Sequence, residues 1–139
     1  MYKRKTWREK MDNPKLPKVV DGEMLLPSPY DIEAVIRTVR EGRLLTTSQL
    51  RETLAGKYAA KTTCPLLTGI LLHIVSEVAE EEAAAGKQRI TPYWRVIKDD
   101  GSLNPKFPGG VERQAERLRE EGHRVVAGRG KKPPRVSNT

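Results

Sequence analysis

The sequence predicts a mainly α-helical domain with a small β-hairpin, arranged as a winged helix-turn-helix. Three observations lead to this fold class. Four segments place apolar residues at helical spacing, two of these helices are separated by only a short link, and one strand-like segment runs into an Asp-Gly turn. At 139 residues, the chain is long enough for one domain with a single modest core.

The chain is expected to have three parts. We predict a basic, proline-containing arm at residues 1–27, a folded domain at residues 28–126 and a basic tail at residues 127–139. Proline fixes the backbone and removes a hydrogen-bond donor, so residues 12–30 should be extended and irregular rather than helical. The prolines in this segment are Pro14, Pro17, Pro27 and Pro29.

The first two helices have recognisable start and stop signals. The first should begin near Asp31, whose side chain can cap it, and end at Gly42. It places an apolar stripe at Ile32, Val35, Ile36 and Val39. The second helix has a capping box, with Thr46 as N-cap and Gln49 three residues later, and Gly56 should stop it.

A third helix is predicted after a link that contains Lys57, Lys61, Thr62 and Thr63. It should open at Thr63 or Cys64, with Pro65 in its first turn, and it becomes acidic and alanine-rich over residues 80–85. Because only this short link separates the second and third helices, they predict a helix-turn-helix whose third helix enters a groove of DNA.

A strand and a final helix complete the predicted domain. Residues 90–97 and the Asp100-Gly101 turn should form a hairpin beside the third helix. The last helix is expected over residues 111–121, with Gly122 as C-cap. Its inward-facing residues are Val111, Ala115 and Leu118.

The charge favours a polyanionic partner. Lys and Arg number 26 against 18 Asp and Glu, giving a net charge of +8 and a pI near 9.8. The basic residues gather at both ends: residues 1–18 carry seven Lys or Arg and two acids, and residues 124–139 carry no acid. These ends are either solvated tails or phosphate-binding arms, and charge attracts phosphate in both cases.

One motif adds a family resemblance. Its parts, in chain order, are Thr91-Pro92-Tyr93-Trp94-Arg95-Val96-Ile97, Asp99-Asp100-Gly101, Pro108-Gly109-Gly110 and Glu121-Gly122. The order resembles the O6-alkylguanine-DNA alkyltransferases, whose pattern is Pro-Cys-His-Arg-Val, a Gly-containing turn, Gly-Gly and Glu-Gly. The resemblance covers roughly residues 28–126. It implies a winged helix-turn-helix with a base pocket formed by Pro92, Tyr93, Trp94, Arg95, Gly109 and Gly110.

The thiol chemistry of that family is expected to be missing here. Family members transfer an alkyl group from a flipped guanine to a cysteine, which a histidine and a distant glutamate activate. Tyr93 stands at the cysteine and Trp94 at the histidine, and a gap-free alignment puts Ala115 at the glutamate. The pattern therefore resembles the alkyltransferase-like proteins, which keep the fold and replace the nucleophile.

The pocket residues also have simpler interpretations. Aromatic residues on a half-buried strand are usually core packing, and the bulk of Tyr93 and Trp94 can fill a base pocket instead of lining it. Arg95 either binds phosphate or braces the loop behind the pocket. Gly109 and Gly110 either permit close approach of a base or begin the last helix.

The predicted contacts with DNA come from the helix-turn-helix: Thr46, Thr47, Ser48, Lys57, Lys61, Thr62, Thr63, Leu66 and Gly69. In the family, an arginine fills the hole left by the flipped nucleotide and a tyrosine pushes the phosphate. Here these positions fall at Leu66 and at Thr47 or Ser48. Leucine can wedge between bases but cannot pair with the orphaned cytosine, so the residues favour DNA binding over nucleotide flipping.

Cys64 is a separate candidate for chemistry. At a helix N-terminus near Lys61 its thiolate would be favoured, although single cysteines more often serve as packing residues. One Cys and two scattered His exclude a plausible zinc site, and we expect neither a metal nor a cofactor.

The functional hypothesis is a DNA-binding protein, expected not to be an enzyme, that recognises alkylated or damaged guanine and marks it for another repair pathway. Two alternatives remain: a winged-helix regulator or architectural protein without lesion preference, and a transferase that uses Cys64. The expected partners are double-stranded DNA and downstream repair proteins, and the protein should be a monomer. Without an apolar span or a signal-peptide core, it should be cytoplasmic, and nucleoid-associated if bacterial.

Overall fold

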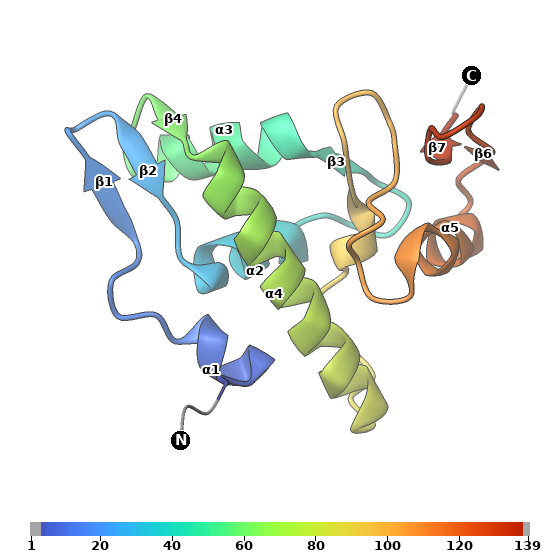
Figure 1. The fold of residues 1–139 in the computed structure, drawn as a ribbon, viewed down its shortest axis with the longest axis horizontal. Helices are drawn as coiled ribbons and strands as arrows, with labels where there is room; N and C mark the ends of the chain where they lie inside the picture. The colour runs from blue at the N-terminus through green and yellow to red at the C-terminus, as the bar shows by residue number, and fades with distance from the viewer. Residues whose placement is uncertain (1–3, 138–139) are drawn as a thin grey trace.

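The computed structural model describes residues 4–137, so Lys3 of the predicted arm lies outside the described residues. Helices dominate, and the strands are short (Figure 1). In chain order the elements are α1 (Trp7–Met11), β1 (Lys18–Val20), β2 (Met24–Leu26), α2 (Pro29–Arg37), β3 (Leu45–Thr46), α3 (Thr47–Lys57), β4 (Thr62–Thr63), α4 (Pro65–Ala84), the 3₁₀ turn η1 (Tyr93–Arg95), β5 (Val96–Ile97), α5 (Gly110–Glu120), β6 (Val125–Val126) and β7 (Arg135–Val136). The result is a mostly helical molecule with three small sheets.

Local capping signals account for the helix starts. The predicted capping box of α3 is confirmed: Thr46 accepts from the Gln49 amide, and the Gln49 side chain accepts from the Thr46 amide. The N-cap of α2 is Ser28 rather than Asp31, because the Asp31 carboxylate bonds back to the Ser28 amide. This helix also ends at Arg37, well before Gly42.

The 20-residue helix α4 is the central element, and it lies against α1 and α2 (Figure 1). It begins as predicted, with Cys64 as N-cap and Pro65 in the first turn, where a missing amide hydrogen costs nothing. Apolar side chains from every helix meet in one core around it. Its fully buried members include Met11, Leu25, Ile32, Ile36, Leu50, Leu54, Leu72, Val75, Tyr93, Leu103 and Leu118.

The segment of residues 12–30, expected to be extended and irregular, is extended but not irregular. Strands β1 and β2 form an antiparallel hairpin, and β2 pairs in parallel with β4 directly before α4. Met11 of α1 and Leu25 of β2 are buried in the core. Pro14, Pro17 and Pro27 lie between these elements, so they limit strand length without preventing pairing, and Pro29 is the first residue of α2.

The predicted hairpin through residues 90–101 is also wrong. Tyr93–Arg95 form a 3₁₀ turn, and only Val96–Ile97 form a strand. This strand pairs in parallel with β3, Leu45 facing Val96 and Thr46 facing Ile97. The Asp100-Gly101 turn itself is present, with Gly101 at a φ of 87°. It leads away from β5 toward the C-terminal segment, where Ser102 bridges to Arg135.

The C-terminal part packs against the body through α5 (Figure 1). Ala115 and Leu118 are buried as predicted, and Gly122 follows the helix at a φ of 93°, a conformation suited to a helix stop. Beyond it, β6 and β7 form a two-stranded sheet that buries Val125 and Val136. Within residues 4–137, no helix has both the length and the apolar character needed to cross a membrane.

Candidate functional site

Tyr93, at the position of the family nucleophile, is part of the core. Its exposed fraction is 0%, and its ring packs edge-on against Phe107, with ring centres 5.0 Å apart. The hydroxyl donates to Glu80 of α4 at 2.6 Å. Burial and this bond to a carboxylate raise the pKa of the Tyr93 phenol, because both disfavour the phenolate. Tyr93 is therefore a neutral side chain whose ring packs in the core and whose hydroxyl is hydrogen-bonded.

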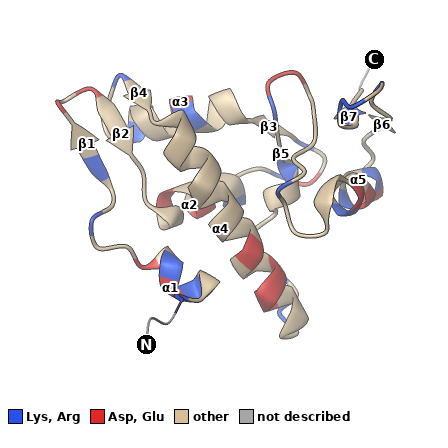
Figure 2. Ribbon diagram, in the orientation of Figure 1, with Lys and Arg blue, Asp and Glu red and all other residues tan. Residues whose placement is uncertain are grey.

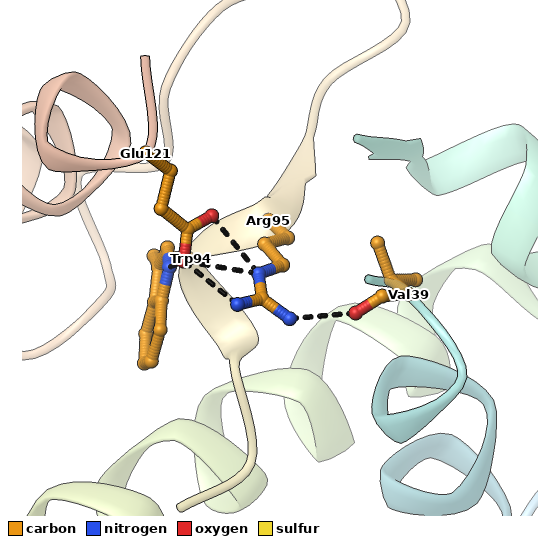
Figure 3. Close-up of polar contacts among 4 residues, drawn as sticks. All are labelled: Val39, Trp94, Arg95 and Glu121. Carbon is orange, nitrogen blue, oxygen red and sulfur yellow. Dashed lines mark hydrogen bonds and ion pairs between the residues drawn. The ribbon is translucent and has the colours of Figure 1, made fainter. Parts of the chain in front are cut away.

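Trp94, at the position of the family histidine, lies beside a carboxylate (Figure 3). Its Nε1 donates to Glu121 Oε2 at 3.0 Å, and the Arg117 guanidinium carbon lies 4.3 Å from its ring centre. This carboxylate comes from the C-cap position of α5 and not from the position of Ala115. Ala115 is instead a buried packing residue.

Arg95 braces three segments of the chain, as Figure 3 shows. Its Nε donates to Glu121 Oε1 at 2.9 Å and its Nη2 to Glu121 Oε2 at 2.7 Å, while Nη1 donates to the Val39 carbonyl at 2.6 Å. Burial raises the pKa of the Glu121 carboxyl, but the hydrogen bonds from Arg95 and Trp94 outweigh it and hold the pKa below its usual value. The paired Arg95 supports the loop rather than offering a free charge to phosphate.

Gln114 is a positioning residue that sequence reasoning missed. It is 1% exposed, and its Nε2 donates to the carbonyls of Trp94 at 3.1 Å and Val96 at 3.0 Å. Its Oε1 accepts from the Asn104 amide at 2.8 Å. The sequence signal that could have revealed Gln114 is its place on the inward face of α5, next to Ala115 and one turn before Leu118. A buried amide there must bond to backbone.

A cavity of about 510 Å³ opens beside this cluster. Its lining residues are Arg37, Glu41, Ala83, Lys87, Gln88, Arg89, Ile90, Pro92, Trp94, Arg95, Arg117 and Glu121. Of the predicted base pocket, Pro92, Trp94 and Arg95 line the cavity, whereas Tyr93, Gly109 and Gly110 do not. The two glycines have φ values of 79° and 70° and begin α5 in a left-handed conformation that favours glycine.

The start of α4 carries the most exposed large apolar side chain of the described residues. Leu66 is 76% exposed, and Ile70, one turn later on the same face, is 50% exposed. Gly69 lies exposed beside them. The predicted contacts Lys57, Lys61 and Thr62 are also exposed, and Lys61 pairs with Glu23 at 2.9 Å.

Four of the five predicted hydroxyl contacts, all except Thr62, form hydrogen bonds within the fold. Thr46 caps α3, and the buried Thr63 donates to the Arg51 carbonyl at 2.8 Å. Thr47 Oγ1 donates to Asp99 at 3.3 Å, and both the amide and the hydroxyl of Ser48 donate to the same carboxylate. These bonds, those from Ser48 first, lower the pKa of Asp99. An acidic side chain thus occupies the place where a phosphate would meet Thr47 and Ser48.

Cys64 and the histidines do not assemble into a site. Cys64 is half-buried, and its amide donates to the Leu25 carbonyl at 2.9 Å. His73 lies further along α4, where its Nδ1 is 2.7 Å from the Lys106 carbonyl oxygen. Within residues 4–137, no group of three or more His, Cys, Asp or Glu side chains is placed to hold a metal ion.

Comparisons with known proteins give a structural relative but no sequence relative. No model of a protein family matches the sequence, and neither does any curated protein. The fold is similar to that of S. pombe Atl1 in its crystal structure with damaged DNA containing O6-carboxymethylguanine, with a TM-score of 0.52 at 15% sequence identity. The match covers 78% of this chain and 87% of the Atl1 chain. The chain thus shares the overall fold of Atl1, a mostly helical domain with small sheets.

Proposed function

We propose that this protein binds duplex DNA through α3 and the first half of α4, and that it recognises alkylated or otherwise damaged guanine without repairing it. In this proposal the bound protein marks the lesion for another repair pathway. The winged helix-turn-helix belongs to the proposal as well, with the β1–β2 hairpin beside the start of α4 as the wing.

The exposed apolar face of α4 is the observation that carries the DNA-binding proposal. Leu66 and Ile70 are exposed on the first turns of α4, and the exposed lysines Lys57 and Lys61 precede this helix in the chain. Apolar side chains can enter the base stack, while the lysines attract phosphate. The fold shared with Atl1, which was solved bound to damaged DNA, supports the same assignment.

The lack of repair follows from the chemistry at position 93. A phenol that is buried, neutral and bonded to Glu80 is not an alkyl acceptor comparable to an activated thiolate. Cys64 is the single cysteine of the chain, and it caps α4 rather than facing Trp94 or Glu121. Recognition without transfer is therefore the activity that these residues support best.

Binding to matched duplexes tests the proposal. Affinity should fall steeply with salt for both duplexes, because Lys and Arg displace counterions from phosphate. Affinity should be higher for the duplex that contains O6-methylguanine than for its undamaged counterpart. Equal affinity for the two duplexes would assign the protein to the regulatory or architectural DNA-binding proteins. Absence of binding to either duplex would refute the proposal that DNA is the partner.

Mass spectrometry of the protein after incubation with the methylated duplex tests the absence of repair. We expect an unchanged protein mass and intact O6-methylguanine in the recovered DNA. A protein heavier by one methyl group, mapped to Cys64, would make the protein a transferase. The variant Cys64→Ser is the control, because it removes the only thiol.

A further inference from the structure

The geometry points to a nucleotide-binding site in the cavity beside Trp94, with a phosphate at the rim cations and the planar base against the inner wall. None of its lining residues belongs to α3 or to the first half of α4. The site is therefore separate from the proposed DNA-binding face. The inference does not rest on the proposed function, since it concerns a ligand that is tested without duplex DNA.

Three exposed cations line the cavity: Arg37, Lys87 and Arg89. Lys87 pairs with Glu82 at 2.7 Å, and Arg37 lies 3.8 Å from Glu33 and also acts electrostatically on Glu82. Among residues 4–137, no side chain forms a hydrogen bond or ion pair with Arg89. Its guanidinium is thus free to hold a phosphate with two parallel N–H donors.

The inner wall contains an arginine stacked on a tryptophan. Arg117 lies over the Trp94 ring, held there by a 2.7 Å bond from its Nη2 to Glu80. Bases stack on arginine guanidinium planes as well as on aromatic rings, and here the Arg117 guanidinium, backed by the largely buried Trp94 ring, provides the stacking surface. Ile90 and Pro92 add apolar surface on the same lining. Because Trp94 and Arg117 are already positioned by Glu121 and Glu80, a bound base would not have to order them.

Size and the remaining polar groups favour a nucleotide over a larger polyanion. A cavity of about 510 Å³ falls within the range of about 300–1,000 Å³ typical of small-molecule sites. Glu41 and Gln88 also line it and are exposed. A carboxylate among the cations disfavours a dense polyanion, but it can accept hydrogen bonds from the ring N–H and amino groups of a purine such as guanine.

Tryptophan fluorescence tests this site directly. The chain has two tryptophans, so Trp7→Phe leaves Trp94 as the only one. This variant is titrated with deoxyguanosine monophosphate, and separately with deoxyguanosine and inorganic phosphate. We expect a saturable change with the nucleotide and at least tenfold weaker binding of either fragment. Absence of a saturable change, or equal binding of phosphate alone, would overturn the proposal.

A second variant assigns the binding to the cavity. Arg89→Gln in the same background should weaken nucleotide binding by about tenfold, since it removes a charge-assisted contact. Lys98→Gln removes an exposed cation outside the lining and should leave affinity unchanged. Unchanged melting temperatures show that both variants remain folded. Equal effects of the two substitutions would mean nonspecific charge attraction and would refute the site.

Competition identifies the source of the nucleotide. A short single-stranded oligonucleotide that displaces deoxyguanosine monophosphate would show that the cavity takes a unit of a nucleic-acid strand. A lack of displacement would assign the cavity to free nucleotides. Duplex binding, measured on the same variants, reports on the proposed function separately, because Arg89 lies outside α3 and α4.

Discussion

The two halves of α4 differ sharply in what their side chains contact. Residues 65–76 contain no Asp, Glu, Lys or Arg, whereas the second half carries the glutamates Glu77, Glu80, Glu81 and Glu82 (Figure 2). In the second half, Glu80 accepts from both Tyr93 and Arg117, and Glu82 pairs with Lys87 and, at 3.5 Å, with Arg8. In the first half, Leu66 and Ile70 project into solvent.

Under the proposed function, this difference separates a stabilising half of the helix from a DNA-binding half. The second half contacts α1 and α5 through ion pairs and η1 through the Tyr93–Glu80 hydrogen bond, so its polar residues have structural partners. The outward face of the first half has no such partners among the described residues, and an exposed leucine contributes little to folding. Substitutions near the second half should therefore change stability, and those at Leu66 should change binding.

Trp94→Ala should give the largest effect. The substitution removes a buried indole, its hydrogen bond to Glu121 and its contact with Arg117, and we expect a loss of about 3–5 kcal/mol in the free energy of unfolding. Chemical denaturation measures the change. Affinity for damaged and undamaged duplexes should fall together as the protein unfolds. A stable variant that loses only lesion preference would instead make Trp94 a lesion reader.

Glu121→Gln should cost somewhat less, about 2–3 kcal/mol, because it leaves Arg95 partly buried without its counter-charge. The loss should depend on pH. The folded-state pKa of Glu121 is held below the ordinary 4.5, so its contribution is present above pH 4.5 and disappears as pH falls through the folded value. Unfolding curves of the wild type and the variant should converge in acid. A constant gap down to acid pH would contradict an ionic role.

Tyr93→Phe should cost about 1 kcal/mol, the typical contribution of one buried hydrogen bond. Glu80 keeps its bond to Arg117, so the carboxylate is not left unpaired. Tyr58→Phe is the matched control, since its hydroxyl also donates to a carboxylate, Asp31, but at the surface. Denaturation midpoints should show a smaller change for the control. Equal losses would mean that burial of Tyr93 adds nothing to its hydrogen bond.

Leu66→Gln should change stability by less than about 0.5 kcal/mol, because the side chain is exposed. DNA affinity should nevertheless fall several-fold in a fluorescence anisotropy titration. Tyr30→Gln, at another exposed large side chain but on α2, should leave affinity unchanged. If both variants bind DNA like the wild type, the start of α4 is not the interface.

Asp99→Asn should have the smallest effect, a modest gain in DNA affinity of about two- to threefold, equivalent to less than 1 kcal/mol. The carboxylate occupies the hydrogen-bond donors of Thr47 and Ser48, and removing its charge favours a phosphate there. Affinity titrations at two salt concentrations measure the gain. Weaker binding would show that Asp99 positions α3 for DNA rather than competing with phosphate.

The sequence by itself determined the starts of α3 and α4, the stop of α5 and the basic character. Capping boxes, an N-terminal proline and a glycine after the helix act within a few residues, so local sequence is enough to reveal them.

Tertiary structure alone decided which distant segments meet. The parallel pairing of β3 with β5 joins residues about 50 positions apart, and two-residue strands carry no periodic signal. Likewise, Glu121 meets Trp94 and Arg95 only because α5 packs back onto η1. The burial of Tyr93 has the same origin, because the core places Phe107 and Glu80 around its ring and hydroxyl. Such contacts depend on the packing of the whole chain, and no short segment encodes them.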